Sequence, residues 1–109
     1  MKAKPVVARE RANRDIDEAI AWYLGEHAAP AAFGFIDAVE RAFIHVGRFP
    51  SAGSPRYALE LNLPELRCWP VPGYPWLVFY VERDDHIDIW RVLHSQRDIP
   101  AWMDGPNPP

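Results

Sequence analysis

Cysteine is almost absent from this sequence, with Cys68 as the one example among 109 residues. One cysteine excludes an internal disulfide, so we expect a reducing compartment, the cytoplasm. No apolar run approaches the roughly 20 residues of a bilayer span, and charges interrupt the segment after Lys2 and Lys4, so we expect neither a membrane segment nor a signal peptide. Glycine-rich phosphate loops and histidine pairs at metal-ligand spacing are missing too, so we expect no cofactor and no metal.

Positive charge is also scarce. The net charge is −3, whereas nucleic-acid-binding proteins usually carry a basic surplus, because neutralising phosphates supplies much of their affinity. Between residues 66 and 97 the charges balance, with four arginines against four acidic residues: Arg67, Arg83, Arg91 and Arg97 against Glu82, Asp84, Asp85 and Asp88. We therefore expect no direct DNA binding by this chain alone.

Apolar residues, in contrast, are plentiful. The hydrophobic fraction is 49% and the aromatic fraction 13%, which suffices for one compact core without disulfide or metal support. We predict a single domain over residues 1–103. The polar, proline-rich residues 104–109 are predicted to be a disordered tail.

The first half of the chain has the periodicity of a short strand and two helices. Residues 5–8 suit a strand, with Pro5 at its start. From Arg9 the apolar positions recur at helical spacing, and Gly25 ends that helix. The apolar side of the first helix is formed by Ala12, Ile16, Ala19, Ile20 and Tyr23, and Arg11, Arg14, Asp15, Asp17 and Glu18 take the other side. Pro30 suits the first turn of a second helix, whose stripe is Ala32, Ile36, Val39, Phe43 and Val46.

The second half predicts three strands joined by tight turns, over residues 66–71, 76–82 and 87–93. Residues 49–55 form a breaker-rich loop, and residues 56–65 alternate as a strand would until Pro64 interrupts them. Strands joined by tight turns pair antiparallel, and a helical hairpin can bury its stripe on one face of such a sheet. Asp98 can cap a short C-terminal helical segment. The predicted fold class is α+β.

Several of these segments together resemble a known family. They are Phe35-Ile-Asp-Ala-Val-Glu-Arg41, Phe49-Pro50 with Gly53, Leu66-Arg67, Leu77-Val-Phe-Tyr80 and Ile89-Trp-Arg-Val-Leu-His-Ser-Gln-Arg-Asp98. In this order they resemble the RelE/ParE toxin superfamily of type II toxin–antitoxin systems, and the ParE branch in particular. The resemblance covers roughly residues 4–98. It implies a bacterial toxin that a cognate antitoxin, ParD-like or similar, holds inactive.

The resemblance implies two different targets. ParE-like members are associated with inhibition of DNA gyrase, and RelE-like members cleave mRNA on the ribosome. A nuclease needs groups that move protons and stabilise a pentavalent phosphate. Arg67, His94 and Arg97 are the candidates here, with Glu60 or Glu65 as a base. Lysine occurs only at positions 2 and 4, so the lysine cluster of the RelE branch is missing, and no tyrosine follows His94.

We therefore interpret the chain as a ParE-like toxin that inhibits gyrase by protein–protein binding. The mRNA endonuclease remains the alternative, and a silent remnant that only binds antitoxin is a third hypothesis. Arginine and aromatic residues dominate interface hot spots, so the candidate contacts to target or antitoxin are Arg67, Trp90, Arg91, His94, Arg97 and Trp102. Most have a structural alternative: Arg67 and Arg91 could pair with sheet-edge acids such as Asp88, His94 could be a structural histidine at a strand end, and the tryptophans could belong to the core.

Overall fold

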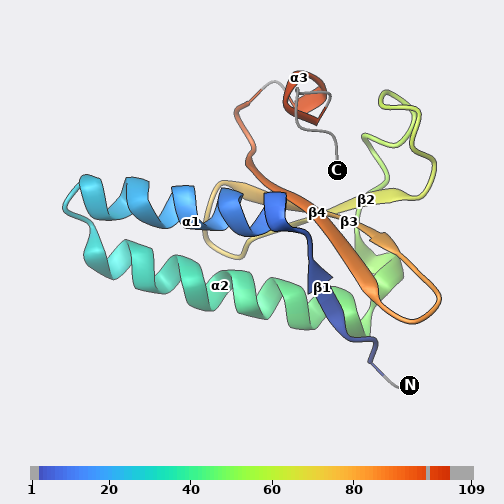
Figure 1. The fold of residues 1–109 in the computed structure, drawn as a ribbon, viewed down its shortest axis with the longest axis horizontal. Coiled ribbons are helices and arrows are strands. Elements are labelled where there is room, and N and C mark those ends of the chain that lie inside the picture. Colours follow the sequence, from blue (N-terminus) through green and yellow to red (C-terminus); the bar gives the residue numbers. More distant parts are fainter. Residues whose placement is uncertain (1–2, 98, 104–109) are drawn as a thin grey trace.

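The computed structural model describes residues 3–97 and 99–103. The elements follow in the order β1 (Val6–Ala8), α1 (Glu10–Gly25), α2 (Ala29–Arg48), the 3-10 turn η1 (Pro50–Ala52), β2 (Leu66–Pro70), β3 (Trp76–Glu82), β4 (Ile87–His94) and α3 (Ile99–Met103). The strand, the two helices, the three later strands and the short final helix are confirmed (Figure 1). The predicted Asp98 cap and the predicted tail at 104–109 lie outside the described residues, and the domain limits stay a prediction.

The four strands form one mixed sheet in the order β1-β4-β3-β2. The predicted antiparallel meander is confirmed, because β2 pairs antiparallel with β3 and β3 with β4. β1 instead joins the sheet parallel to β4. Tight turns dictate antiparallel pairing only between consecutive strands, and the whole helical hairpin lies between β1 and the rest of the sheet. The direction of β1 was therefore not set by any turn.

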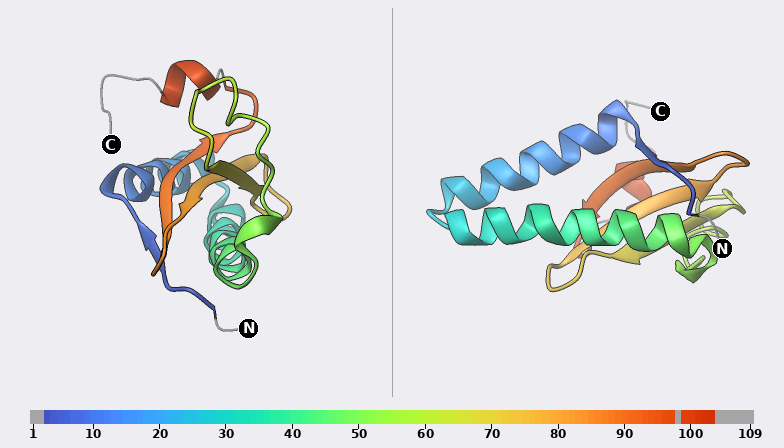
Figure 2. Two further views of the ribbon diagram at one scale, coloured as in Figure 1. Left: turned by 90° about the vertical axis from the view of Figure 1, so that its right-hand side faces the viewer. Right: turned by 90° about the horizontal axis from the view of Figure 1, so that it is seen from below.

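The helical hairpin covers one face of the sheet (Figure 2). Its apolar stripe packs against alternate residues of the central strands, and the buried members of this layer include Phe35, Val39, Val46, Val78, Tyr80, Ile89 and Val92. The stripe predicted for the second helix is confirmed, with Ala32, Val39 and Val46 buried and Ile36 and Phe43 half-buried. The tip of the hairpin extends past the strands and past the turn between β2 and β3 (Figure 1).

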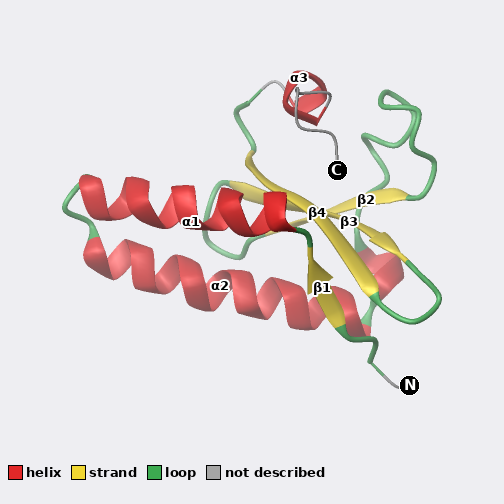
Figure 3. Cartoon of the chain, in the orientation of Figure 1, coloured by secondary structure: helices red, strands yellow, loops and turns green. Residues whose placement is uncertain are grey.

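The opposite face of the sheet is covered by α3 and by the loop before β2 (Figure 3). Residues from these two segments pack over the second core layer, namely Tyr57, Leu61, Leu63, Ile99 and Met103. Residues 56–65, which alternate like a strand, form successive turns instead. Leu59 is 93% exposed and Asn62 has a left-handed φ of 55°, so this segment cannot run as a regular strand.

Local chemistry explains the element ends. α2 has Pro30 in its first turn, where a missing N–H is tolerated. It stops at Arg48, because the residue before Pro50 is disfavoured in the helical region. The turn between β2 and β3 places Gly73 at φ 79°, the left-handed position that a type II turn requires after a proline. In the described chain, no helix combines the length and the hydropathy needed to cross a bilayer.

Candidate functional site

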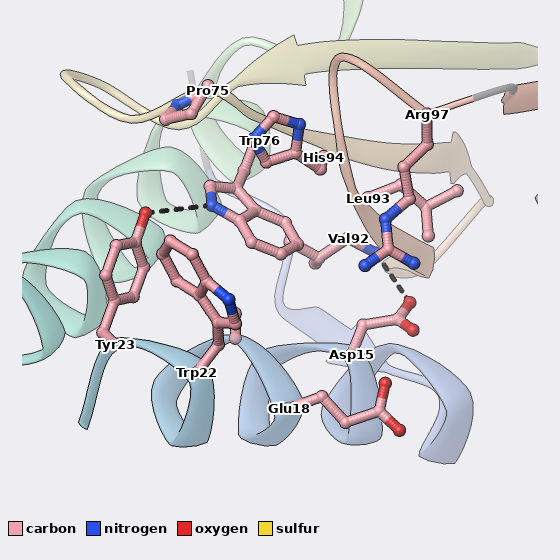
Figure 4. A pocket seen from close by; sticks show the side chains of 11 residues that line it. Asp15, Glu18, Trp22, Tyr23, Pro75, Trp76, Val92, Leu93, His94 and Arg97 are labelled. Carbon is pink, nitrogen blue, oxygen red and sulfur yellow. Dashed lines mark hydrogen bonds between the residues drawn. The ribbon is translucent and has the colours of Figure 1, made fainter. Parts of the chain in front are cut away.

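A cleft lies between α1 and the C-terminal half of β4, and its volume is about 470 Å³ (Figure 4). It exists because β1 pairs only with Ile87–Ile89. The rest of β4 therefore has no strand beside it on that side within the described residues. α1 contributes Asp15, Glu18, Trp22 and Tyr23 to the walls, while the sheet side contributes Trp76, Val92, His94 and Arg97.

Asp15 closes the inner end of this cleft. Its carboxylate accepts hydrogen bonds from Nε and Nη2 of Arg91 at 2.7 and 2.9 Å, and from the Val92 N–H at 3.0 Å. The assignment of Asp15 to the polar side of its helix was wrong, because the residue is only 5% exposed and lies between the buried Ala12 and Ala19. A carboxylate can take that position because a guanidinium and a backbone N–H satisfy it.

Arg91 is therefore part of the interior. It is 7% exposed, and its Nη1 also donates to the carbonyl oxygen of Trp102 at 2.9 Å. Of the two alternatives for Arg91, the ion pair with an acid is the one observed, and the acid is Asp15 on α1 instead of a sheet-edge residue such as Asp88. With its guanidinium held by α1 and α3, Arg91 is not presented at the surface for a target.

His94 lies on the wall of the cleft at the end of β4. Its ring packs edge-to-face on Trp76 with 5.2 Å between the ring centroids, and its Nδ1 accepts from the Gln96 N–H at 3.1 Å. The indole of Trp76 in turn donates to the hydroxyl of Tyr23 at 3.1 Å (Figure 4). This chain of contacts fixes the aromatic side of the cleft. His94 is half-buried. Its role as a contact residue for target or antitoxin stays a prediction.

Arg97 and Trp102 form an accessible pair at the rim. The guanidinium carbon of Arg97 lies 4.0 Å from the centre of the Trp102 ring, a cation–π arrangement. Arg97 is exposed, and Trp102 is 39% exposed. Among the six residues singled out from the sequence, these two have the surface position that a partner contact needs. Such a contact stays a prediction.

Arg67 lies elsewhere and stabilises a turn. Its Nη1 donates to the carbonyl oxygens of Gly53 at 2.8 Å and Ser51 at 3.3 Å. The hydroxyl of Tyr80 accepts from the Gly53 N–H at 3.0 Å and donates to the Pro50 carbonyl at 2.6 Å. Burial raises the pKa of the Tyr80 phenol, which keeps this hydroxyl a proton donor. Together these bonds fasten the 3-10 turn η1 to the sheet.

The structure does not bring the candidate nuclease residues together. Arg67 pairs with Tyr80, whereas His94 pairs with Trp76, four residues away along β3. At about 3.3 Å per strand residue, this separates them by about 13 Å along the sheet, and β3 lies between them. Arg67 shares a polar groove with Glu65 instead. A general acid and a phosphate-binding group must reach the same reacting atoms, so this trio does not form one catalytic site.

Trp90 belongs to a charged cluster at the other end of β4. Asp88 accepts hydrogen bonds from Arg9 at 3.0 Å, from Trp90 Nε1 at 3.1 Å and from Arg83 at 3.1 Å. Burial alone raises the pKa of Asp88, but these hydrogen bonds outweigh it and hold the pKa below its ordinary value. Arg9 also lies 4.4 Å above the Trp90 ring. The cluster joins the N-terminal strand to the turn before β4.

Sequence reasoning missed the contribution of α1 to the cleft. Trp22 is 59% exposed, and it lines the cleft beside Tyr23 and Glu18. A signal was available: Ala12, Asp15, Ala19 and Trp22 follow one another at steps of three, four and three. Trp22 ends this stripe in the cleft, near Trp76 of β3 (Figure 4).

Comparison with known proteins agrees with this fold. Residues 6–99 match the family model described as ParE toxin of type II toxin–antitoxin system, parDE. The chain belongs to the ParE toxin family. A solved chain from the chromosomal ParDE TA system of P. aeruginosa is similar to this ParE-family chain, with a TM-score of 0.72 and 14% sequence identity. The match covers 86% of this chain and 98% of the other, and at this identity it shows the fold alone. No curated protein has a significantly similar sequence.

Proposed function

We propose that this ParE-family chain acts in the cytoplasm as a toxin that binds and inhibits DNA gyrase, and that a ParD-like antitoxin neutralises it. The observation that carries this proposal is the family match over residues 6–99 together with the separation of Arg67 from His94. A toxin of this family without an assembled acid–base site is expected to act by binding. The accessible aromatic and basic groups, Trp22, Arg97 and Trp102, are of the kind that carry binding energy at interfaces.

The antitoxin part is tested by coexpression. A ParD-like candidate antitoxin is expressed with this chain, and the pair is purified through a tag on the toxin. We expect a stable complex, growth arrest when the toxin is expressed alone, and normal growth when both are expressed. Normal growth with the toxin alone would favour the third hypothesis, a silent remnant.

The gyrase part is tested with purified proteins. We expect the toxin to reduce DNA supercoiling by gyrase in a dose-dependent way, and the preformed toxin–antitoxin complex to have no effect. Unchanged supercoiling at a large excess of toxin would remove gyrase as the target. Mapping mRNA 5′ ends after induction tests the nuclease alternative: codon-phased cuts that vanish in His94→Ala would favour it.

A further inference from the structure

The side of α2 that faces away from the sheet carries a row of exposed residues, which we call the outer face. Between residues 31 and 48 the exposed positions of the helix are Phe33, Asp37, Glu40, Arg41, Ile44 and Arg48. With 3.6 residues per turn and a rise of 1.5 Å per residue, they fall within an arc of about 100° and span about 22 Å. α2 lies along one long side of the molecule, and the outer face shares no residue with the cleft between α1 and β4 (Figure 1).

The charged members of the outer face have no charged partner in their own chain. Asp37, Glu40, Arg41 and Arg48 form no ion pair with any described residue. Asp37 and Arg41 stay apart although their spacing, four residues along a helix, is one at which opposite charges commonly pair. The charges of this face are therefore available to another molecule.

The outer face also exposes apolar surface. Phe33 is 66% exposed and Ile44 is 59% exposed, one toward each end of the row. A partner that covers both side chains removes apolar area from water, which favours association.

The spacing of the outer face is the same in both directions along the helix. The steps between its members are four, three, one, three and four. A two-fold axis that crosses the helix between Glu40 and Arg41 therefore places each member opposite a member of a second, antiparallel copy. The pairs across that axis are Glu40 with Arg41, Asp37 with Ile44, and Phe33 with Arg48.

These pairs are chemically complementary. At the centre, the two-fold axis makes the pair of Glu40 with Arg41 occur twice. Asp37 faces Ile44 and lies one turn or less from Arg41 and Arg48 of the other copy. Phe33 meets the Arg48 guanidinium, a cation–π arrangement, and Ile44 of the other copy lies one turn away. A parallel arrangement would set like charges against each other, which electrostatics disfavours.

We propose that the outer face of α2 is a self-association surface, through which two copies of this chain pack antiparallel around a two-fold axis between Glu40 and Arg41. This inference goes beyond the proposed function and does not depend on it, since neither gyrase nor antitoxin enters it. The face is small beside a standard interface of about 1,600 Å², so we expect a dissociation constant on the order of tens of micromolar. The dimer presents two clefts, because the cleft is built from other residues.

Sedimentation velocity of the purified chain at increasing concentration is the first measurement. We expect a reversible monomer–dimer equilibrium. Glu40→Arg and Arg41→Glu each put like charges together twice at the axis, so each variant is expected to weaken the dimer at least about tenfold. Both positions are exposed, so circular dichroism and urea unfolding are expected to match the parent chain. A chain that stays monomeric at its highest soluble concentration, or variants that dimerise as the parent does, would overturn the proposal.

A mixture of these two variants tests the pairing itself. At the axis, one variant carries only positive charges and the other only negative charges. A mixed dimer therefore has opposite charges in both central pairs, and its affinity is expected to return to within about threefold of the parent dimer. If the mixture stays monomeric, the two residues do not meet across the axis and the proposal is wrong.

The apolar part is tested by a matched pair of variants. Phe33→Ala is expected to weaken the dimer at least about fivefold, because the two-fold axis makes the loss occur twice. Leu59→Ala is the control, since Leu59 is 93% exposed in the turns before β2 and lies outside the outer face; it is expected to change the affinity less than about twofold. Equal effects of the two variants would contradict the proposal.

A ParD-like antitoxin is the competing occupant of the outer face. If the free chain is monomeric and Phe33→Ala weakens the coexpressed toxin–antitoxin complex at least about tenfold, the face binds antitoxin and the proposal is overturned. The opposite result separates the two proposals. If the chain neither inhibits gyrase nor binds antitoxin but its dimer responds to the variants as expected, the proposed function fails and this inference stands.

Discussion

Asp15 on α1 and Arg91 on β4 form a two-bonded ion pair between residues 76 positions apart, at 2.7 and 2.9 Å. Both side chains are buried, at 4% and 8% exposure. The same carboxylate also accepts from the Val92 N–H, so it occupies part of the strand edge that β1 leaves open. The pair therefore fixes the distance between α1 and β4, and with it the width of the cleft.

Loss of Asp15 is predicted to be severe. Asp15→Ala leaves the Arg91 guanidinium buried without its partner, which typically lowers the free energy of unfolding by about 3–5 kcal/mol. Urea denaturation followed by circular dichroism measures this. Asp17→Ala, at an exposed position of the same helix, is the control and is expected to change stability by less than about 0.5 kcal/mol. A loss below about 1 kcal/mol for Asp15→Ala would contradict the role of the pair.

Replacing both partners together is predicted to be milder. Asp15→Leu combined with Arg91→Met removes the two charges at once, and buried ion pairs replaced by apolar residues of similar volume often lose little stability. We expect the double variant to be more stable than Asp15→Ala in the same urea titration. A double variant no more stable than Asp15→Ala would contradict this prediction.

The hydroxyl of Tyr80 is predicted to hold the turn η1. Tyr80→Phe leaves the Gly53 N–H and the Pro50 carbonyl without their partner, and an unsatisfied buried polar group costs about 1–3 kcal/mol. Thermal and urea unfolding measure the loss, and faster amide exchange at Gly53 locates it. Tyr57→Phe is the control, because the Tyr57 hydroxyl makes only an exposed contact with Arg56. A stability equal to the parent chain would contradict this prediction.

Asp88 is predicted to make stability depend on pH. Its pKa in the folded chain lies below the ordinary value, which is about 3.9 in an unfolded chain. The unfolded state then binds more protons in this range, so the stabilisation is complete above about pH 5 and is lost as pH falls through the folded-state pKa. Asp88→Asn is expected to lower the free energy of unfolding by about 1.5–3 kcal/mol at pH 7, because hydrogen bonds to a charged group are lost.

The pH series supplies the decisive comparison for Asp88. The difference between Asp88→Asn and the parent chain is expected to shrink steadily below about pH 4. Asp84→Asn, at an exposed position of the turn before β4, is the control. The difference in stability between Asp84→Asn and the parent chain is expected to stay the same at every pH of the series. A constant gap between parent and Asp88→Asn from pH 7 to pH 3 would contradict the prediction.

Gly47 is predicted to be required by the close approach of the N-terminal segment. A Cβ there would lie 2.9 Å from the carbonyl oxygen of Lys4 and 3.1 Å from the Val6 side chain. Gly47→Ala is therefore expected to destabilise the chain by about 1–3 kcal/mol, as overpacking does, despite the higher helix propensity of alanine. Gly25→Ala has no atom within 4 Å of its new Cβ and is expected to be neutral or slightly stabilising. Equal stability of the two variants would contradict this account.

Much of the fold could be predicted because the relevant signals are local. The apolar stripe of α2 can be recognised within a few helical turns, and the continuous apolar run of β3 within a few residues. The Pro72-Gly73 turn makes its two flanking strands pair antiparallel, and this signal is also local. Residues 56–65 were ambiguous because alternation at Leu59, Leu61 and Leu63 is a pattern that turns can also carry. The exposed Leu59 and the left-handed backbone at Asn62 exclude a regular strand there.

The order and type of the elements, the α+β class and the resemblance to the ParE family could all be recognised in the sequence, since periodicity, breakers and turn residues act between near neighbours. Tertiary structure alone decided that β1 runs parallel to β4, that Asp15 is buried against Arg91 and that Arg67 lies far from His94. These outcomes depend on which segments meet across dozens of residues. No local pattern encodes such a meeting, because its free energy comes from contacts that exist only once the sheet and the hairpin have assembled.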